Sequence, residues 1–148
     1  MVDIEEVKQW AVRRWRLGAI HGVSHWERVE RNGLFLATPE CDLTVIRLFA
    51  YLHDSCRKDD YEDEEHGARA AKKIERLRDT LLKDLRDEQF ALLQQACRLH
   101  TGTHRTGNPT IDTCFDADRL DLTRVGITPI PEKMATEKGK AKASAMSK

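Results

Sequence analysis

The sequence lacks an excess of charge of either sign, because 25 lysines and arginines are balanced by 25 aspartates and glutamates. A broad electrostatic attraction to a nucleic acid polymer or to a membrane surface is therefore not expected. Long hydrophobic runs are lacking too: the apolar stretch 45–52 is interrupted by Arg47 and is far shorter than the roughly 20 residues that a membrane span needs. We expect no nucleic acid or membrane partner, and a charged partner would be a small molecule recognised locally.

Cysteine is sparse and scattered. The four cysteines lie far apart with no Cys-x-x-Cys pair, which argues against a structural zinc site. The first ten residues carry Asp3, Glu5 and Glu6, and they do not resemble a signal peptide. These features predict a protein of the reducing cytoplasm.

Strand patterns are also lacking, since no segment alternates apolar and polar residues with the two-residue period of a half-buried strand. Apolar residues instead recur at helical spacing in successive segments, which glycine, proline or charged residues separate. The segment 42–53 is apolar over most of its circumference and predicts a helix at the centre of the molecule. The predicted fold is all-α, a single-domain helical bundle, because 148 residues suffice for one domain with a real core.

Several side chains indicate where helices begin. Asp3 and Ser24 are each followed three residues later by a glutamate, which is the form of a capping box. Thr110 is the expected cap of the last core helix, at 111–122. Residues 132–148 are rich in Lys, Ala and Ser with almost no large apolar side chain, so we expect a helical domain at 1–131 and favour a flexible tail over a docked helix.

Four of the six histidines lie on four different predicted helices, next to an apolar stripe or at its end. They are His25, His53, His66 and His100. A single histidine of this kind is more often a surface residue or a hydrogen-bonded core residue than a ligand. Four that converge inside a bundle would be costly to bury without partners, so together they indicate a hydrogen-bond network or a metal site.

Carboxylates accompany these histidines. Asp54 follows His53 directly, and Asp116 and Asp118 lie on the last core helix. Imidazole nitrogen and carboxylate oxygen together suit one or two divalent transition metal ions, namely Mn, Fe, Zn, Co or Ni. The residues alone do not distinguish these metals.

Three widely spaced motifs resemble the signature of the HD superfamily of metal-dependent phosphohydrolases. They are SHWERV at 24–29, YLHDSCR at 51–57 and DADRLDL at 116–122. The dipeptide HD alone carries little information, but the combination of the three motifs is specific. The resemblance covers about residues 24–130 and implies a helical bundle of the HD-domain type. It also implies one metal held by His25, His53, Asp54 and Asp118, where aligning ADRL favours Asp118 and leaves Asp116 as the alternative.

Some members of that superfamily have two further histidines between the HD pair and the last aspartate. His66 and His100 occupy this interval, which implies a second metal with Asp54 as the bridging ligand. The alternative is a single metal, with His66 and His100 contacting the substrate. Paired cations about 4 Å apart suit phosphate ester cleavage, because they neutralise phosphoryl oxygens and provide hydroxide at neutral pH.

Basic residues close to these motifs are candidates for binding the substrate. Arg57 and Lys58 follow the HD pair, and Arg124 follows the last motif. The competing interpretation is that Arg28, Arg119 and Arg124 form structural ion pairs with acids such as Asp121, which we favour for Arg119. His21 and His104 are further candidates for contacts around the site.

The resemblance implies a metal-dependent hydrolase of a small phosphorylated substrate, with nucleotides the most common class among relatives. Asp54 would be the catalytic residue. One alternative is a di-iron oxygenase on the same six ligands, similar to the inositol oxygenases. The other is a regulatory module that retains the metal and binds a nucleotide without turnover.

Overall fold

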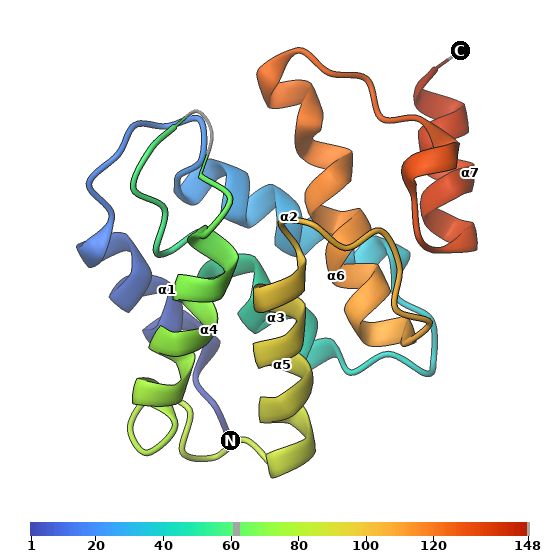
Figure 1. The fold of residues 1–148 in the computed structure, drawn as a ribbon. Helices are drawn as coiled ribbons and strands as arrows, with labels where there is room; N and C mark the ends of the chain where they lie inside the picture. The colour runs from blue at the N-terminus through green and yellow to red at the C-terminus, as the bar shows by residue number, and fades with distance from the viewer. Residues whose placement is uncertain (61–62, 148) are drawn as a thin grey trace.

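The computed structural model describes residues 1–60 and 63–147, and this part of the chain is helical with no strand. The prediction of an all-α, single-domain protein is confirmed (Figure 1). The helices are α1 (Ile4–Arg14), α2 (Val23–Leu36), α3 (Leu43–Leu52), α4 (His66–Leu77), α5 (Asp87–Leu99), α6 (Pro109–Arg119) and α7 (Glu137–Met146), with 3-10 turns η1 (Leu120–Val125) and η2 (Pro131–Lys133).

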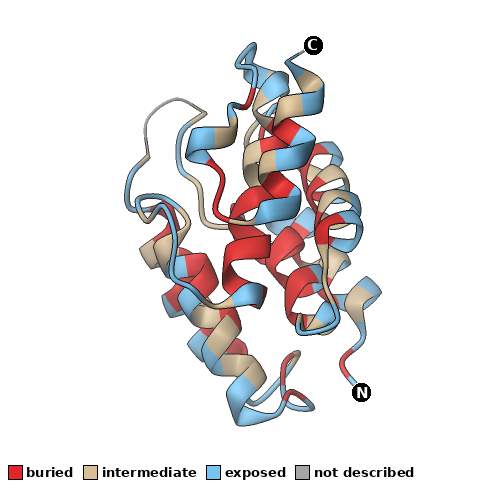
Figure 2. Ribbon diagram, turned by 90° about the vertical axis from the view of Figure 1, so that its right-hand side faces the viewer, coloured by how far each residue is buried: buried red, intermediate tan, exposed pale blue. Residues whose placement is uncertain are grey.

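Helix α3 is the centre of the molecule, as its composition predicts. It contacts α1, α2, α5 and α6, and seven of its ten residues are buried. Asp42 caps its first turn by accepting a hydrogen bond from the backbone N–H of Val45. Fully burying each large apolar side chain contributes about 1.5–3 kcal/mol, so α3 anchors the surrounding helices. Buried residues gather on the faces that these helices turn toward one another (Figure 2).

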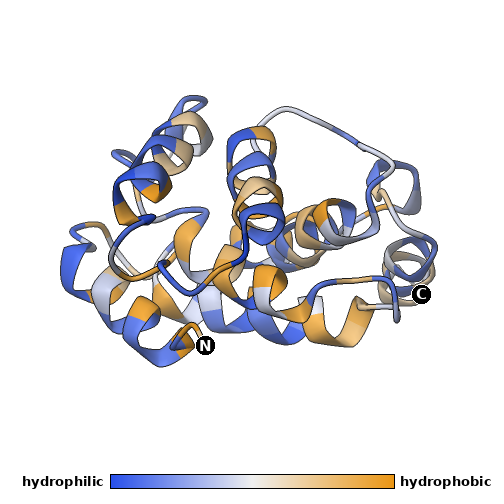
Figure 3. Ribbon diagram, turned by 90° about the horizontal axis from the view of Figure 1, so that it is seen from below, coloured by the Kyte–Doolittle hydropathy of each residue, from blue (hydrophilic) through white to orange (hydrophobic). Residues whose placement is uncertain are grey.

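The outer helices α1, α2 and α4 are amphipathic, with hydrophobic positions at intervals that place them on one side. Figure 3 shows that hydrophobic and hydrophilic positions both occur within the helices. Within residues 1–60 and 63–147, no helix combines the length and the apolar character needed to cross a membrane.

The observed N-cap residue agrees with the predicted one in one helix and differs from it in two. Asp3 caps α1 by accepting from the N–H of Glu6, as predicted. The expected caps Ser24 and Thr110 lie inside helices, because Gly22 and Asn108 hold the cap positions of α2 and α6. In α6 the reason is Pro109: proline has no N–H to satisfy and favours the first helical position, which leaves the preceding asparagine as the cap.

Helices α4 and α5 lie side by side, and Gly67 permits their close approach at one end (Figure 1). A Cβ atom at Gly67 would lie 2.6 Å from the carbonyl oxygen of Cys97 on α5. Any side chain here would push the two helices apart. Gly67 follows His66, and Cys97 precedes His100 by three residues, so this contact brings the two histidines together.

The C-terminal residues differ from the flexible tail that their composition favours. Residues 137–146 form α7, which lies beside α6 (Figure 1). Small residues make the docking possible: Gly139 and Ala143 are buried, and Ala143 joins a second apolar cluster with Leu36, Leu120 and Met134. Thr136 caps α7 and also donates to the carboxylate of Asp116 on α6. This hydrogen bond to Asp116 helps to hold α7 against α6, although the segment lacks large apolar side chains.

Candidate metal centre

Five separate segments bring the six predicted ligands to one place. Two of the six residues lie within helices, His25 near the start of α2 and Asp118 near the end of α6. The other four lie at helix ends or directly after them. His53 and Asp54 follow α3, His66 begins α4 and His100 follows α5. A helical bundle assembles such a cluster from side chains that project inward from facing helices.

The first donor group consists of His25, His53, Asp54 and Asp118, whose ligand atoms all lie within 4.8 Å of one another. His25 Nε2 lies 3.1 Å from Asp54 Oδ2 and 3.1 Å from Asp118 Oδ1. His53 Nε2 lies 3.3 Å from the same oxygen of Asp118. Both imidazoles are fully buried, whereas the Asp118 side chain is 23% exposed, so the group is open to solvent on the Asp118 side.

The second donor group consists of Asp54, His66 and His100. Here the other oxygen of the Asp54 carboxylate is used: Oδ1 lies 2.9 Å from His66 Nε2 and 3.7 Å from His100 Nε2. Asp54 therefore belongs to both groups and presents one oxygen to each. This is the arrangement that a bridging carboxylate between two cations requires.

Hydrogen bonds on the far side of each ring orient the histidines. His53 Nδ1 donates to the carbonyl oxygen of Phe49 at 2.9 Å, and His100 Nδ1 donates to that of Cys97 at 2.6 Å. His66 Nδ1 faces the carbonyl of Asp63 in the same way. Because a carbonyl oxygen only accepts, these bonds place the proton on Nδ1 and leave the Nε2 lone pair directed into the cluster.

His25 is oriented by a carboxylate instead of a carbonyl. Its Nδ1 lies 2.7 Å from Asp121 Oδ2, and the other oxygen of Asp121 accepts from Arg28 Nε at 2.7 Å. A carboxylate hydrogen-bonded to the outer nitrogen of a histidine fixes the ring and increases the basicity of the inner nitrogen, a common arrangement around metal-bound histidines. From the sequence alone, Asp121 is expected only as an ion-pair partner. Its position three residues after Asp118, and so on the same side of the chain, is the signal that was missed.

The inner atoms of the cluster fit a bound cation. The Nε2 atoms of His66 and His100 lie 2.9 Å apart, and those of His25 and His53 lie 3.3 Å apart. In their neutral forms, with the protons on Nδ1, the rings of each pair would place two lone pairs against each other. Asp54 Oδ2 is buried and accepts no hydrogen bond from the described residues. One cation in each donor group would satisfy these atoms.

The pKa values also indicate strong attraction for positive charge. Burial disfavours a charged His25, but the nearby carboxylates of Asp118, Asp121 and Asp54 outweigh it and raise the pKa to about 9. For His53, burial is likewise outweighed by Asp54 and Asp118, and the pKa rises to about 10. Although burial opposes ionisation, the neighbouring histidines hold the pKa of Asp54 and of Asp118 well below the usual range. The two carboxylates are therefore ionised at neutral pH and available as ligands.

The structure decides between the two candidate aspartates of the last motif. Asp116 is fully buried away from the cluster, where its carboxylate accepts from the N–H groups of Ala135 and Thr136 at 2.8 Å and from Arg119 at 3.1 Å. Its lone pairs are used in holding the C-terminal segment. Asp118 is the aspartate of the donor group.

The three basic residues proposed as substrate contacts lie in different surroundings. Arg57 Nε lies 3.8 Å from Asp54 Oδ1, so its guanidinium borders the cluster. Arg124 donates to His21 Nδ1 and to the carbonyl of Asp121, which places it behind the ligand His25. Lys58 instead lines a groove beside α4. The roles of Arg57, Lys58 and Arg124 in substrate binding stay predictions.

Two arginines form the structural ion pairs that are the competing interpretation of the sequence. Arg28 forms an ion pair with Asp121 at 2.7 Å, and Arg119 forms one with Asp116 at 3.1 Å. Arg119 also donates to the carbonyls of Thr103 and His104, so its guanidinium holds the loop after α5.

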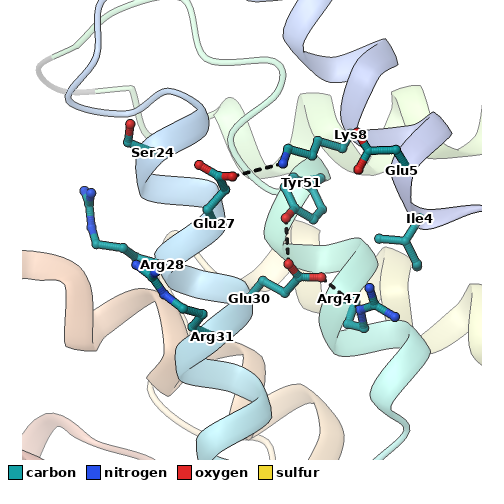
Figure 4. A pocket seen from close by; sticks show the side chains of 10 residues that line it. All are labelled: Ile4, Glu5, Lys8, Ser24, Glu27, Arg28, Glu30, Arg31, Arg47 and Tyr51. Atoms are coloured by element: carbon teal, nitrogen blue, oxygen red, sulfur yellow. Dashed lines mark hydrogen bonds and ion pairs between the residues drawn. The ribbon is translucent and has the colours of Figure 1, made fainter.

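An open hollow of about 500 Å³ adjoins the second donor group, of which only His100 forms part of the hollow's wall. The loop 101–104, Arg119 and Lys133 form the rest. Another cavity, of about 520 Å³, lies between α1, α2 and α3 and contains none of the six ligands (Figure 4). Charges in that second cavity pair with one another, as in Lys8–Glu27 at 3.0 Å and Arg47–Glu30 at 2.9 Å.

No family model, curated protein or solved structure matched the chain. Buried His and Asp side chains are positioned to hold a metal ion in an all-helical fold, and this arrangement is compatible with a site of the HD type. Nitrogen and oxygen donors without any cysteine suit Mn, Fe, Co, Ni or Zn.

Proposed function

We propose that the protein is a metal-dependent hydrolase of a small phosphorylated substrate, with nucleotides as the leading class. The observation that carries this proposal is the sharing of Asp54 between two donor groups, one carboxylate oxygen in each. Six ligands, one of them a shared carboxylate, suit a pair of divalent ions. Two ions about 4 Å apart stabilise both the attacking and the leaving oxygen of a phosphoryl transfer.

Residues around the two donor groups would have distinct roles in the reaction. Asp54 holds the two ligand groups at a constant separation, and Asp121 keeps the His25 ring oriented toward the centre. Arg57, beside Asp54, is placed to contact phosphoryl oxygens, since guanidinium binds such groups through two N–H donors. The open hollow next to His100 offers room for the rest of the substrate. Bound metal would supply Lewis acidity and lower the pKa of a coordinated water.

The test combines metal analysis with an activity survey on protein purified without chelator. We expect about two equivalents of a transition metal per chain, and metal-dependent phosphate release from a member of a panel of phosphomonoesters, cyclic nucleotides and nucleoside triphosphates. The matched control is Asp79→Ala, which removes an exposed carboxylate far from the six ligands.

Two results would contradict the proposal. Iron-dependent oxygen consumption without phosphate release would indicate a di-iron oxygenase. Tight binding of one panel member with no turnover in the metal-loaded protein would indicate a regulatory module.

A further inference from the structure

A groove of about 320 Å³ beside α4 has a wall composed almost entirely of positive side chains. Its lining residues are Cys56, Lys58, Arg69, Lys72, Lys73 and Arg76. No aspartate or glutamate of residues 1–60 and 63–147 is part of that lining. Because the whole chain has no net charge, five cations around one small groove mark a local separation of charge.

Four of these cations are uncompensated within the described residues. Arg69 forms an ion pair with Asp63, which neutralises its charge. No carboxylate in the described part of the chain forms an ion pair with Lys58, Lys72, Lys73 or Arg76. Cations held near one another without counter-charges repel, and a bound anion relieves this repulsion.

Hydrogen bonds fix the segment after α3 against α4 beside the groove. Arg69 Nε donates to the carbonyl oxygen of Cys56 at 3.0 Å, and the backbone N–H of Lys58 donates to Asp63 Oδ2 at 2.7 Å. These bonds join the segment after α3 to the first turns of α4. The groove therefore exists before a ligand arrives, which lowers the entropic cost of binding.

The cations form a row. On α4, Arg69, Lys72 or Lys73, and Arg76 recur every three or four residues, which places them along one side of the helix at intervals of about 5 Å. A row of this kind suits an elongated ligand with several negative charges more than a single phosphate. The row also starts close to the metal centre, since Cys56 lies two residues after Asp54 and Arg69 one turn after His66.

We infer that this groove is a second anion site, which binds a polyphosphate group of three or more charges. Two sources share this chemistry: the phosphates of a polyphosphorylated substrate that are remote from the bond being cleaved, and a free polyphosphate that binds independently. The first source rests on the proposed function, and the second does not.

The binding test uses inorganic tripolyphosphate and full-length protein carrying Asp54→Ala, so that the metal centre does not contribute. Calorimetry should detect binding in this background. Adding Lys72→Glu and Arg76→Glu, both at exposed positions, should weaken it about tenfold or more. The control is Arg13→Glu with Lys83→Glu, which changes net charge equally at exposed positions outside the groove and should leave the affinity within about twofold.

The inference is overturned if tripolyphosphate does not bind, or if the groove variant and its control lose affinity equally. The second result would indicate a nonspecific charge effect. Folding of each variant is checked by its helical circular dichroism. If the groove variant retains native helicity and native affinity, the groove is not the site.

Kinetics in the otherwise native, metal-loaded protein then distinguish the two sources. If the groove binds the substrate, Lys72→Glu with Arg76→Glu raises KM about tenfold for a triphosphate ester, leaves kcat unchanged, and leaves KM for a monophosphate ester unchanged. If a free polyphosphate is the ligand, both KM values stay constant while tripolyphosphate affinity falls. Absence of any hydrolysis would count against the proposed function alone, because the calorimetric result does not depend on it.

Discussion

The Nε2 atoms of His66 and His100 face each other at 2.9 Å, while the Nδ1 atom of each ring faces a backbone carbonyl. Two neutral rings in these tautomers would direct one lone pair at the other. The contact becomes favourable when a proton or a cation lies between the rings. The second donor group is therefore positioned to hold a cation, and it shares Asp54 with the first group.

Removing one of these rings tests the two-ion arrangement. His66→Ala should reduce bound metal from about two equivalents per chain to about one, because the first donor group shares only Asp54 with the second. Elemental mass spectrometry of the purified variant measures this ratio. His104→Ala is the control, since His104 belongs to neither donor group. Retention of two equivalents in His66→Ala would place the second ion elsewhere.

Removing the shared carboxylate should affect both ions. Asp54→Ala is expected to abolish metal binding and any hydrolysis while keeping the helical circular dichroism nearly native, because α3 and its neighbours pack through apolar side chains. The exposed variant Asp79→Ala should resemble the native protein in both measurements. An unchanged metal content in Asp54→Ala would remove the basis for the assignment.

The hydrogen bond from His25 to Asp121 predicts that loss of Asp121 weakens metal binding without abolishing it. Asp121→Ala should weaken metal binding roughly 10- to 100-fold, because the His25 ring loses its orientation and its increased basicity. Competition with a chromogenic chelator measures the affinity. Arg28→Ala is the matched control: it breaks the ion pair with Asp121 but keeps the bond to His25. If both variants bind metal equally well, Asp121 has no role in holding the ligand.

Because α7 is docked on α6, a glycine-to-alanine substitution in α7 is expected to lower the stability of the protein, which is the opposite of the usual effect within a helix. Alanine is generally more stable than glycine inside a helix by about 0.5–1 kcal/mol. At Gly139, however, an added Cβ would collide with the carboxylate of Asp116, so Gly139→Ala should destabilise the protein by about 1–3 kcal/mol. Urea unfolding measures the difference in free energy. Gly102→Ala, where nothing lies within 4 Å of an added Cβ, should change little. A more stable Gly139→Ala would contradict the docked position of α7.

Residues of the candidate centre could be named from the sequence because each lies in a short motif or on a helical stripe. His53 and Asp54 follow the most apolar segment, and His66 begins the next stripe. Helix caps were less predictable, since Ser24 and Gly22 are both plausible and the choice depends on the path of the preceding loop. The role of Gly67 could not be predicted, because it depends on a contact with Cys97 thirty residues away.

The sequence by itself determined the all-α class, since helical period is a local property of the chain, and the resemblance of its motifs to the HD signature provided the six candidate ligands. Only the tertiary structure decided that Asp54 presents one oxygen to each donor group, that Asp118 and not Asp116 joins the cluster, and that residues 137–146 dock as α7. Each of these depends on how distant segments pack. The same carboxylate type becomes a ligand or a helix anchor according to which N–H groups and imidazoles lie within hydrogen-bond distance of it.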